Sequence, residues 1–333
     1  MTHIGRAEQD ISREATTNAQ ACNMQAIPNR EEGTGRRLAG LGGLTAGRYV
    51  DLLWLLTLGT LWGSSFLFIK VIVAEVPAFT LVAGRLAIAT ATMWIVLRLR
   101  GFSMPRDRRT WGAFALMGLF NGALPYSLIS WGEQHTSSGM ASLLMATTPL
   151  FTLILSHLFT QDERITPLKA IGVAVGFAGI GLLMVPDLRQ GIRAGLLGQV
   201  AIIVSSLSYA TATLFARLLL RGQPAMAVTT GQLTTGLLFT LPLSLFIDRP
   251  FDLSPSLPAL ASWVGLALLG TVAAYLIYFP LLNRTGATFS SMVTYIVPVN
   301  GLLLGALVLH EPLQATVLAS LVLVAAGVAL VRS

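Results

Sequence analysis

The stretch HTSSGMASLLMATTPLFTLILSHLFTQDER, residues 135–164, decides the fold, because the chain repeats its pattern. The second copy reads RTGATFSSMVTYIVPVNGLLLGALVLHE, residues 284–311. In both copies a short polar lead is followed by an apolar run with one proline, and a glutamate closes the run. The matching pairs are Ser142 with Ser291, Pro149 with Pro298 and Glu163 with Glu311. A repeat of this length indicates two duplicated halves.

The same register continues upstream of this stretch. Trp62 aligns with Tyr209 and Arg85 with Gln232, both 147 positions apart. Tyr126 aligns with Tyr275, and Gly122 with Thr271, both 149 positions apart. A drift of two positions is what small differences in loop length would produce. The duplication therefore covers most of the chain.

The composition places the chain in a membrane. Hydrophobic residues make up 54% of the sequence and charged residues only 11%, whereas a soluble domain has about a quarter charged residues. The formal net charge of +7 is explained by membrane topology, so no nucleic-acid partner is predicted. The single cysteine, Cys22, excludes a disulfide framework within one chain. The lipid bilayer is the expected surrounding.

Ten apolar runs are long enough to cross about 30 Å of hydrocarbon. The predicted spans are residues 52–73, 77–98, 111–131, 138–159, 167–185, 195–216, 225–247, 259–281, 288–309 and 315–331. Residues 1–48 lack a sustained apolar face and are expected to form a disordered cytoplasmic tail. The first repeat then covers residues 49–187 and the second residues 194–333. The predicted fold class is an all-α integral membrane protein.

Basic residues predict the orientation of this bundle. They gather on one side, above all between spans two and three, at Arg98, Arg100, Arg106, Arg108 and Arg109. The positive-inside rule then places both termini in the cytoplasm, in a multi-pass inner-membrane protein. Because each repeat has five spans, the second enters the membrane from the opposite side. Inverted repeats of this kind can expose a central site alternately to either side.

The repeated residues resemble a known family. The EamA-type repeat of the drug/metabolite transporter superfamily is similar to this chain at Trp62-Gly63-Ser64-Ser65-Phe66, Arg85, Pro149 and Glu163, and again at Pro298, Glu311 and Gly327. The resemblance covers residues 50–331. It implies ten helices, cytoplasmic termini and a cavity lined by spans one, three, four, six, eight and nine. It also implies movement of small metabolites, often amino acids or toxic analogues, commonly outward.

Aromatic and hydroxyl side chains are the candidate cavity residues. On span eight, Thr271, Tyr275 and Tyr278 have i, i+4, i+7 spacing and would form one stripe. The predicted cavity set is Trp62, Asn121, Tyr126, Tyr209, Thr271, Tyr275, Ser291 and Tyr295. Such a set could offer hydrogen bonds and cation–π faces to an amine or aromatic ligand. The alternative is that these aromatics are packing or interface-belt residues, which is credible for Tyr278 near its helix end. Interhelical hydrogen bonding is the commoner use of an intramembrane asparagine such as Asn121.

Arg85 is the most conspicuous charge inside a predicted span. A buried membrane charge is costly unless it faces protein or water, which makes function a default hypothesis. A structural arginine that ties span two to a neighbouring helix is an equal alternative. Lys70 lies near a helix end, and its long side chain is expected to reach the interface.

Three acids and a histidine lie near predicted helix ends. Glu133 and His135 are candidates for proton coupling, although a solvated loop acid is the favoured interpretation of Glu133. Glu163 and Glu311 are expected to stabilise the starts of the helices that follow them. Pro149 and Pro298 are expected to interrupt spans four and nine and to act as kinks or hinges.

These features predict a secondary transporter that moves a small organic metabolite by alternating access. Its expected partners are that small molecule and the bilayer, with protons as an optional coupling ion and a monomer or homodimer as the assembly. No cofactor, metal site or ATPase motif is expected. The alternative is an integral-membrane enzyme acting on lipid or lipid-linked substrates. It would need a convergent site of His, Asp, Ser or Cys, and the sequence offers none, so no catalytic residue is predicted.

Overall fold

The computed structural model describes residues 39–160 and 165–332. The predicted tail up to residue 38 lies outside these residues, and so does Glu163. The chain divides into two compact units, Met1–Tyr49 and Val50–Ser333. The second unit contains all the predicted spans.

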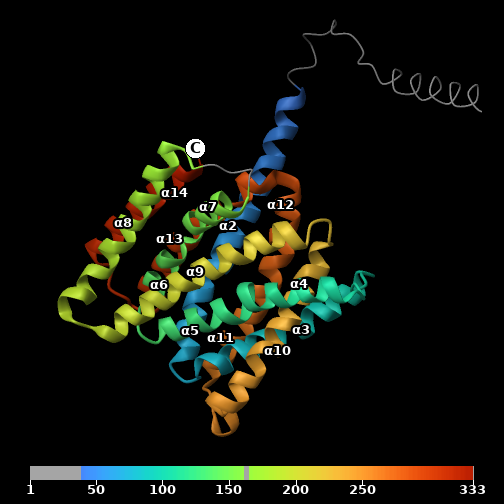
Figure 1. Ribbon diagram of the computed structural model, residues 1–333, viewed down its shortest axis with the longest axis horizontal. Helices are drawn as coiled ribbons and strands as arrows, with labels where there is room; N and C mark the ends of the chain where they lie inside the picture. The colour runs from blue at the N-terminus through green and yellow to red at the C-terminus, as the bar shows by residue number, and fades with distance from the viewer. Residues whose placement is uncertain (1–38, 161–164, 333) are drawn as a thin grey trace, which may run out of the picture. The chain divides into compact units, whose positions relative to one another are not determined.

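All regular secondary structure in the described part of the chain is helical (Figure 1). Spans one and two are α2 and α3, and span three is formed by α4, η1 and α5. Span four consists of α6 and α7, and spans five and six are α8 and α9. Span seven is α10 with η2, span eight is α11, η4 and α12, and spans nine and ten are α13 and α14. The bounds are α2 Ala39–Val73, α3 Ala78–Leu99, α4 Arg108–Gly118, η1 Leu119–Ala123, α5 Leu124–Glu133, α6 Ser138–Met145, α7 Thr148–Phe159, α8 Pro167–Gln190, α9 Arg193–Leu219, α10 Ala225–Leu243, η2 Ser244–Asp248, η3 Pro250–Asp252, α11 Leu257–Ala267, η4 Leu268–Ala273, α12 Ala274–Ser290, α13 Val293–Val308 and α14 Ala315–Arg332.

Among the described residues, nine helical segments are long and apolar enough to cross a membrane, and Val293–Val308 is a shorter apolar helix. This helix, which forms span nine, is short because Ser291 and Met292 form a turn before α13 begins. The predicted fold class, ten spans in two inverted five-helix repeats, is confirmed.

Side-chain caps explain several helix starts. Asp107 accepts a hydrogen bond from the Thr110 N–H at the start of α4, and Ser137 accepts one from Met140 at the start of α6. Ser256 caps α11 in the same way. A short polar side chain at this position satisfies a backbone N–H that the helix leaves unpaired.

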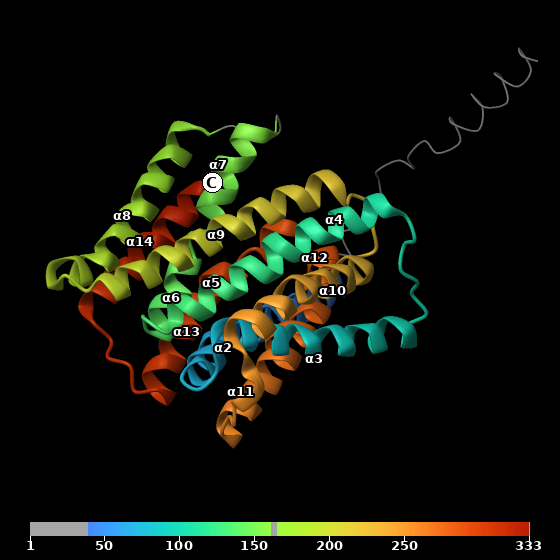
Figure 2. The same cartoon turned by 60° about the horizontal axis from the view of Figure 1, so that its bottom comes forward.

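Repeat partners pack against each other. α8 packs on α14, α3 on α10 and α6 on α13, and Figures 1 and 2 show α8 and α14 side by side at one edge of the bundle. The α8–α14 contact depends on glycine. A Cβ atom at Gly327 would lie 2.5 Å from the Gly176 nitrogen and 2.6 Å from the Gly172 oxygen. Only residues without a side chain allow two helices to approach this closely.

Spans three and eight contain matching irregularities. The π-helical segments η1, Leu119–Ala123, and η4, Leu268–Ala273, occupy equivalent places in the two repeats. One contains Asn121 and the other contains Thr271, both predicted cavity residues. π-Helical turns within α-helices occur frequently at functional sites, because they shift the side chains that follow to a new face.

Span four is interrupted and span nine is not. α6 ends at Met145 and α7 begins at Thr148, so the break directly precedes Pro149. Proline has no N–H to donate to the preceding turn. At Pro298 the expected interruption is absent, because α13 continues through that residue. The break in this region lies earlier, at the turn before Val293.

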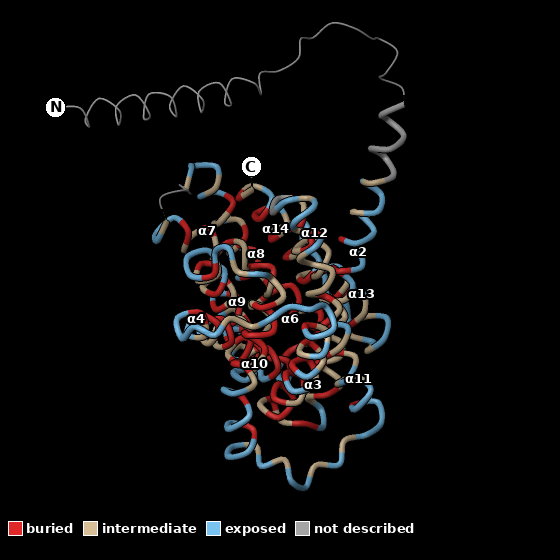
Figure 3. The backbone as a smooth tube through the Cα atoms, turned by 90° about the vertical axis from the view of Figure 1, so that its right-hand side faces the viewer, coloured by how far each residue is buried: buried red, intermediate tan, exposed pale blue. Residues whose placement is uncertain are grey.

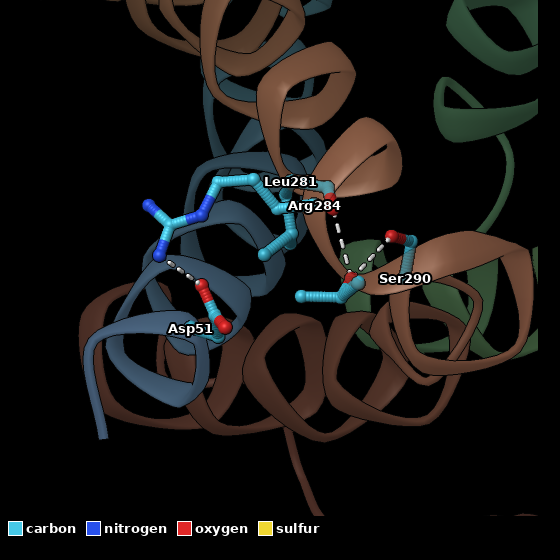
Figure 4. Close-up of polar contacts among 5 residues, drawn as sticks. Asp51, Leu281, Arg284 and Ser290 are labelled. Carbon is cyan, nitrogen blue, oxygen red and sulfur yellow. Dashed lines mark hydrogen bonds and ion pairs between the residues drawn. The ribbon is translucent and has the colours of Figure 1, made fainter. Parts of the chain in front are cut away.

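Buried residues gather inside the bundle, and exposed residues concentrate at its surface and connections (Figure 3). At one end of the bundle, Arg284 on α12 pairs with Asp51 on α2, with 3.0 Å between Nη2 and Oδ1 (Figure 4). Nearby, the Thr285 hydroxyl donates to the Leu281 carbonyl at 2.8 Å. The arginine side chain is 53% exposed, so this pair contributes little to stability.

Candidate substrate cavity

A cavity of about 480 Å³ lies inside the bundle. Its lining comes from spans one, two, three, four, six, seven, eight and nine, while the described residues of spans five and ten contribute none. The resemblance implied six of these spans, and the structure adds spans two and seven. A mostly apolar cavity of this size with a few polar groups is the usual form of a small-molecule site.

Five of the predicted cavity residues line this cavity: Trp62, Asn121, Tyr126, Tyr209 and Tyr275. The aromatic rings contact one another across the repeats. The ring centroids of Tyr126 and Tyr209 are 6.4 Å apart, in the T-shaped arrangement that aromatic pairs favour.

Tyr278, for which a packing role was the alternative, also lines the cavity. Its ring centroid lies 5.5 Å from that of Trp62. It shares the cavity face of α12 with Tyr275, as the spacing of the predicted stripe requires. Phe279, next to it, also lines the cavity.

Asn121 makes the interhelical hydrogen bonds expected of it. Its Nδ2 donates to Gln232 Oε1 at 3.0 Å and to the Tyr275 hydroxyl at 3.2 Å. Gln232 lines the cavity and was not among the predicted site residues. The signal that could have identified it is its repeat alignment with Arg85.

Arg85 faces the cavity from α3 and is only 5% exposed. Its Nε donates to the Thr271 hydroxyl at 2.9 Å, and its guanidinium carbon lies 3.8 Å from the Tyr126 ring centroid. The arginine therefore links span two to spans three and eight. Thr271 is fully buried behind it and does not itself line the cavity.

Ser291 and Tyr295 were predicted to line the cavity, but neither of them does. They lie beside Arg332 at the end of α14, whose Nη2 donates to the Ser291 carbonyl at 2.8 Å. The guanidinium carbon of Arg332 is 4.8 Å from the Tyr295 ring centroid. The prediction assumed continuous helical spacing, but the turn at Ser291 changes the helix phase. Thr294 and Val297 line the cavity instead.

One end of the cavity is closed by a contact between spans one and three. Lys70 Nζ donates to the carbonyls of Glu133 and Thr136, at 2.6 and 2.7 Å. Lys70 is half-buried, and its ammonium group binds protein carbonyls near the end of its helix. One of these carbonyls ends α5 and the other lies in the connection to α6, so Lys70 joins span one to this connection.

Glu133 is fully buried, so the interpretation as a solvated loop acid is also wrong. Neither carboxylate oxygen has a hydrogen-bond partner among the described residues. His135 is exposed and packs against Trp131 with ring centroids 4.9 Å apart. The structure thus separates these two proton-coupling candidates, one inside the bundle and one on its surface.

Glu311 caps a helix, but not the one expected. Its carboxylate accepts hydrogen bonds from the Ser138 N–H at 2.8 Å and the Gly139 N–H at 3.1 Å, at the start of α6. It lies before α14, which starts at Ala315. The carboxylate therefore complements the positive end of a helix in the other repeat. It joins spans four and nine at the same end of the cavity as Lys70.

The cavity extends toward the opposite ends of these spans. Its lining there includes Met117 near the start of span three, Ala216 near the end of span six and Val293 at the start of α13. No group of three His, Cys, Asp or Glu residues arranged for a metal ion occurs in the described ranges. The arrangement suits reversible binding of a small molecule by aromatic faces, amides and one guanidinium.

Comparison with known proteins identifies the family. The model of the EamA-like transporter family matches residues 51–185 and 196–333. The chain belongs to the EamA-like transporter family. It is therefore a multi-pass membrane transporter, and the alternative of a membrane enzyme is set aside. The two matched ranges correspond to the two repeats that share the cavity.

Several relatives support this assignment. An uncharacterized transporter, YoaV, from Bacillus subtilis is 23% identical, and the match covers 83% of this chain and 94% of that protein. The uncharacterized inner membrane transporter YedA from Escherichia coli is 29% identical over 75% of this chain and 80% of its own length. A probable terminal-alkyne amino-acid exporter from Streptantibioticus cattleyicolor is 29% identical, and the match covers 74% of this chain and 81% of that protein. These similarities place this EamA-like transporter in the inner membrane.

A solved structure has the same fold. Its title reads "Crystal structure of protein", and it matches with a TM-score of 0.61 and 19% identity, covering 85% of this chain and 97% of that chain. At this identity the likeness concerns the fold of the EamA-like transporter.

Proposed function

We propose that this EamA-like transporter is a secondary transporter that exports a small organic metabolite through the central cavity by alternating access. The observation that carries the proposal is that repeat partners line one shared cavity. Arg85 and Gln232, Tyr126 and Tyr275, and Trp62 and Tyr209 all face it. A site at the interface of inverted repeats can be opened from either side by exchange of the two halves' conformations.

The cavity favours a substrate with an apolar or aromatic body and a few polar groups. Its rings come from Trp62, Tyr126, Tyr209, Tyr275 and Tyr278, and its amides from Asn121 and Gln232. Amino acids and related compounds have this character. The relative named as a probable amino-acid exporter supports the same class.

The distribution of basic residues supports cytoplasmic termini. In that orientation the closed end with Lys70 and Glu311 is external, and the extension past Met117 points to the cytoplasm. This conformation would accept substrate from inside the cell. Export then requires the contacts at Lys70 and Glu311 to open and the opposite end to close.

Proton coupling, within this proposal, acts through Glu133 and not through His135. The carboxylate of Glu133 is enclosed without a hydrogen-bond partner among the described residues. The charged groups whose fields reach it are Lys70 of α2, Arg85 of α3 and Glu311 after α13. Gain or loss of one proton at this position changes the electrostatics of the closed end.

Release from liposomes tests the proposal. The purified protein is reconstituted, and loss of preloaded labelled amino acids is followed with and without a pH gradient. We expect release by the wild type and its loss in Tyr126→Ala and Tyr275→Ala. Phe239→Ala is the matched control, because this aromatic side chain on α10 is 40% exposed and does not line the cavity.

Unchanged release by both tyrosine variants would contradict the cavity assignment. Glu133→Gln should release substrate without responding to the gradient, whereas His135→Gln should respond as the wild type does. A gradient response that survives in Glu133→Gln would remove Glu133 as the proton site.

A further inference from the structure

The charge balance of the cavity is one-sided. Among the described residues that line it, Arg85 is the charged one, and no aspartate or glutamate is present. The remaining polar lining consists of hydroxyl and amide groups, which are neutral. The field of Glu133 reaches Arg85, but that carboxylate does not line the cavity. A charge inside a membrane protein is costly unless it is paired, which makes an anion within the cavity the physical expectation.

The structure shows which part of Arg85 is already in use. Its Nε is bound to the Thr271 hydroxyl, and Tyr126 supports one face of the guanidinium. Within the described residues its two terminal nitrogens form neither a hydrogen bond nor an ion pair. Neither of these terminal nitrogens is fully enclosed by protein atoms. The terminal nitrogens therefore face the cavity.

This geometry is suited to a carboxylate. The guanidinium is planar and can donate two parallel hydrogen bonds to one carboxylate, an arrangement that an ammonium group cannot match. The bond to Thr271 and the contact with Tyr126 fix its orientation before a ligand arrives. Preorganisation of this kind lowers the entropic cost of binding.

We propose that Arg85 is the carboxylate-binding residue of the cavity, so that the transporter selects organic acids, amino acids included, and rejects amines that lack a carboxylate. The proposal rests on the proposed transport function and specifies its substrate class. It reverses the expectation of an amine ligand, because a cation in this cavity would meet the positive charge of Arg85 with no carboxylate in the lining.

Four compounds with the same phenyl group separate these possibilities. 3-Phenylpropionate carries only a carboxylate, L-phenylalanine a carboxylate and an ammonium, L-phenylalaninamide an ammonium and an amide, and phenethylamine only an ammonium. Binding to the purified full chain is measured in detergent by thermal stabilisation and calorimetry. Release from liposomes is measured separately with the same four compounds.

The wild type should bind 3-phenylpropionate and L-phenylalanine at least about tenfold more tightly than the two compounds without a carboxylate. Arg85→Gln should lose this preference, with affinity for the two carboxylates reduced on the order of tenfold or more. Glutamine is the matched substitution because Gln232 occupies the equivalent place in the other repeat. Arg85→Lys should recover part of the preference, since it restores charge without the planar pair of donors.

Arg98→Gln is the control, because this arginine lies on the same helix, is exposed and does not line the cavity. It should behave as the wild type. The proposal would be overturned if Arg85→Gln bound both carboxylates with wild-type affinity. It would also be overturned if the wild type preferred the amine or the amide, or bound none of the four compounds at millimolar concentration.

The two measurements separate this inference from the proposed transport. Binding of carboxylates through Arg85 without release from liposomes would leave the recognition intact and contradict transport. Release of the amine or the amide, with no preference for carboxylates, would support transport and overturn the recognition.

Discussion

The Glu311 carboxylate accepts hydrogen bonds from the Ser138 N–H at 2.8 Å and the Ser138 hydroxyl at 3.0 Å, although 173 positions separate the two residues. One residue follows α13 of the second repeat and the other begins α6 of the first. The contact therefore joins the halves at the closed end of the cavity. When that end opens, either these hydrogen bonds break or Ser138 and Glu311 move together.

Glu311→Ala should destabilise the closed end. The substitution leaves the Ser138 and Gly139 N–H groups without their acceptor and removes a negative charge from a helix start. Hydrogen bonds to charged groups contribute roughly 1.5–3 kcal/mol each, so we expect a loss on the order of 2 kcal/mol. The unfolding midpoint in detergent measures it. Gln314→Ala in the same connection is exposed and should leave the midpoint unchanged; equal midpoints for both variants would refute the capping role.

Lys70 and Glu133 should be energetically coupled. Lys70→Met removes two hydrogen bonds to carbonyls and leaves the buried Glu133 without its neighbouring cation. We expect it to cost roughly 2–3 kcal/mol. The double variant Lys70→Met, Glu133→Gln should lose less unfolding free energy than the sum of the losses in the two single variants. A double-mutant cycle on unfolding free energies measures this difference, and strict additivity would show that the two groups do not interact.

Gly327→Ala should weaken the packing of α14 on α8. Its Cβ would lie 2.5 Å from the Gly176 nitrogen, which is backbone and cannot rotate away. Overpacking of this kind typically costs about 1–3 kcal/mol. Gly181→Ala is the control on α8, because no atom lies within 4 Å of its added Cβ. Thermal unfolding should show a lower midpoint for the first variant only.

Glu75 should make stability depend on pH in the acidic range. The Ser256 side chain and N–H both donate to its carboxylate at 2.6 Å, and these bonds hold the pKa of Glu75 below its usual value of 4.5. Because the pKa is lower in the folded state, the stabilisation is full above the unfolded-state pKa and is lost as pH falls through the folded one.

The comparison of the wild type with Glu75→Gln tests this dependence. The unfolding midpoint of Glu75→Gln should be slightly lower at pH 7, and the two midpoints should converge as the pH falls below about 4. Thermal unfolding between pH 3 and pH 7 measures the difference. A difference that stays constant across that range would contradict the contribution of the ionised carboxylate.

The sequence by itself determined the ten spans and the duplication. Both follow from local properties, since an apolar run of sufficient length has one stable form in hydrocarbon and a repeat is visible as a fixed spacing. The same spacing correctly placed Trp62, Tyr126 and Tyr209 on the cavity. Trp62 and Tyr209 lie on uninterrupted α-helices, and Tyr126 follows η1 as Tyr275 follows η4, so the repeat alignment holds across both π-helical turns.

Only the tertiary structure decided the positions that depend on helix phase or on a distant partner. The turn at Ser291 precedes Tyr295, whose ring packs against Arg332 and not on the cavity lining. Lys70 and Glu311 bind groups far away in the chain, and burial of Glu133 follows from the packing around it. A local pattern specifies which face a regular helix presents, but contacts between helices specify where that helix bends and what its polar ends bind.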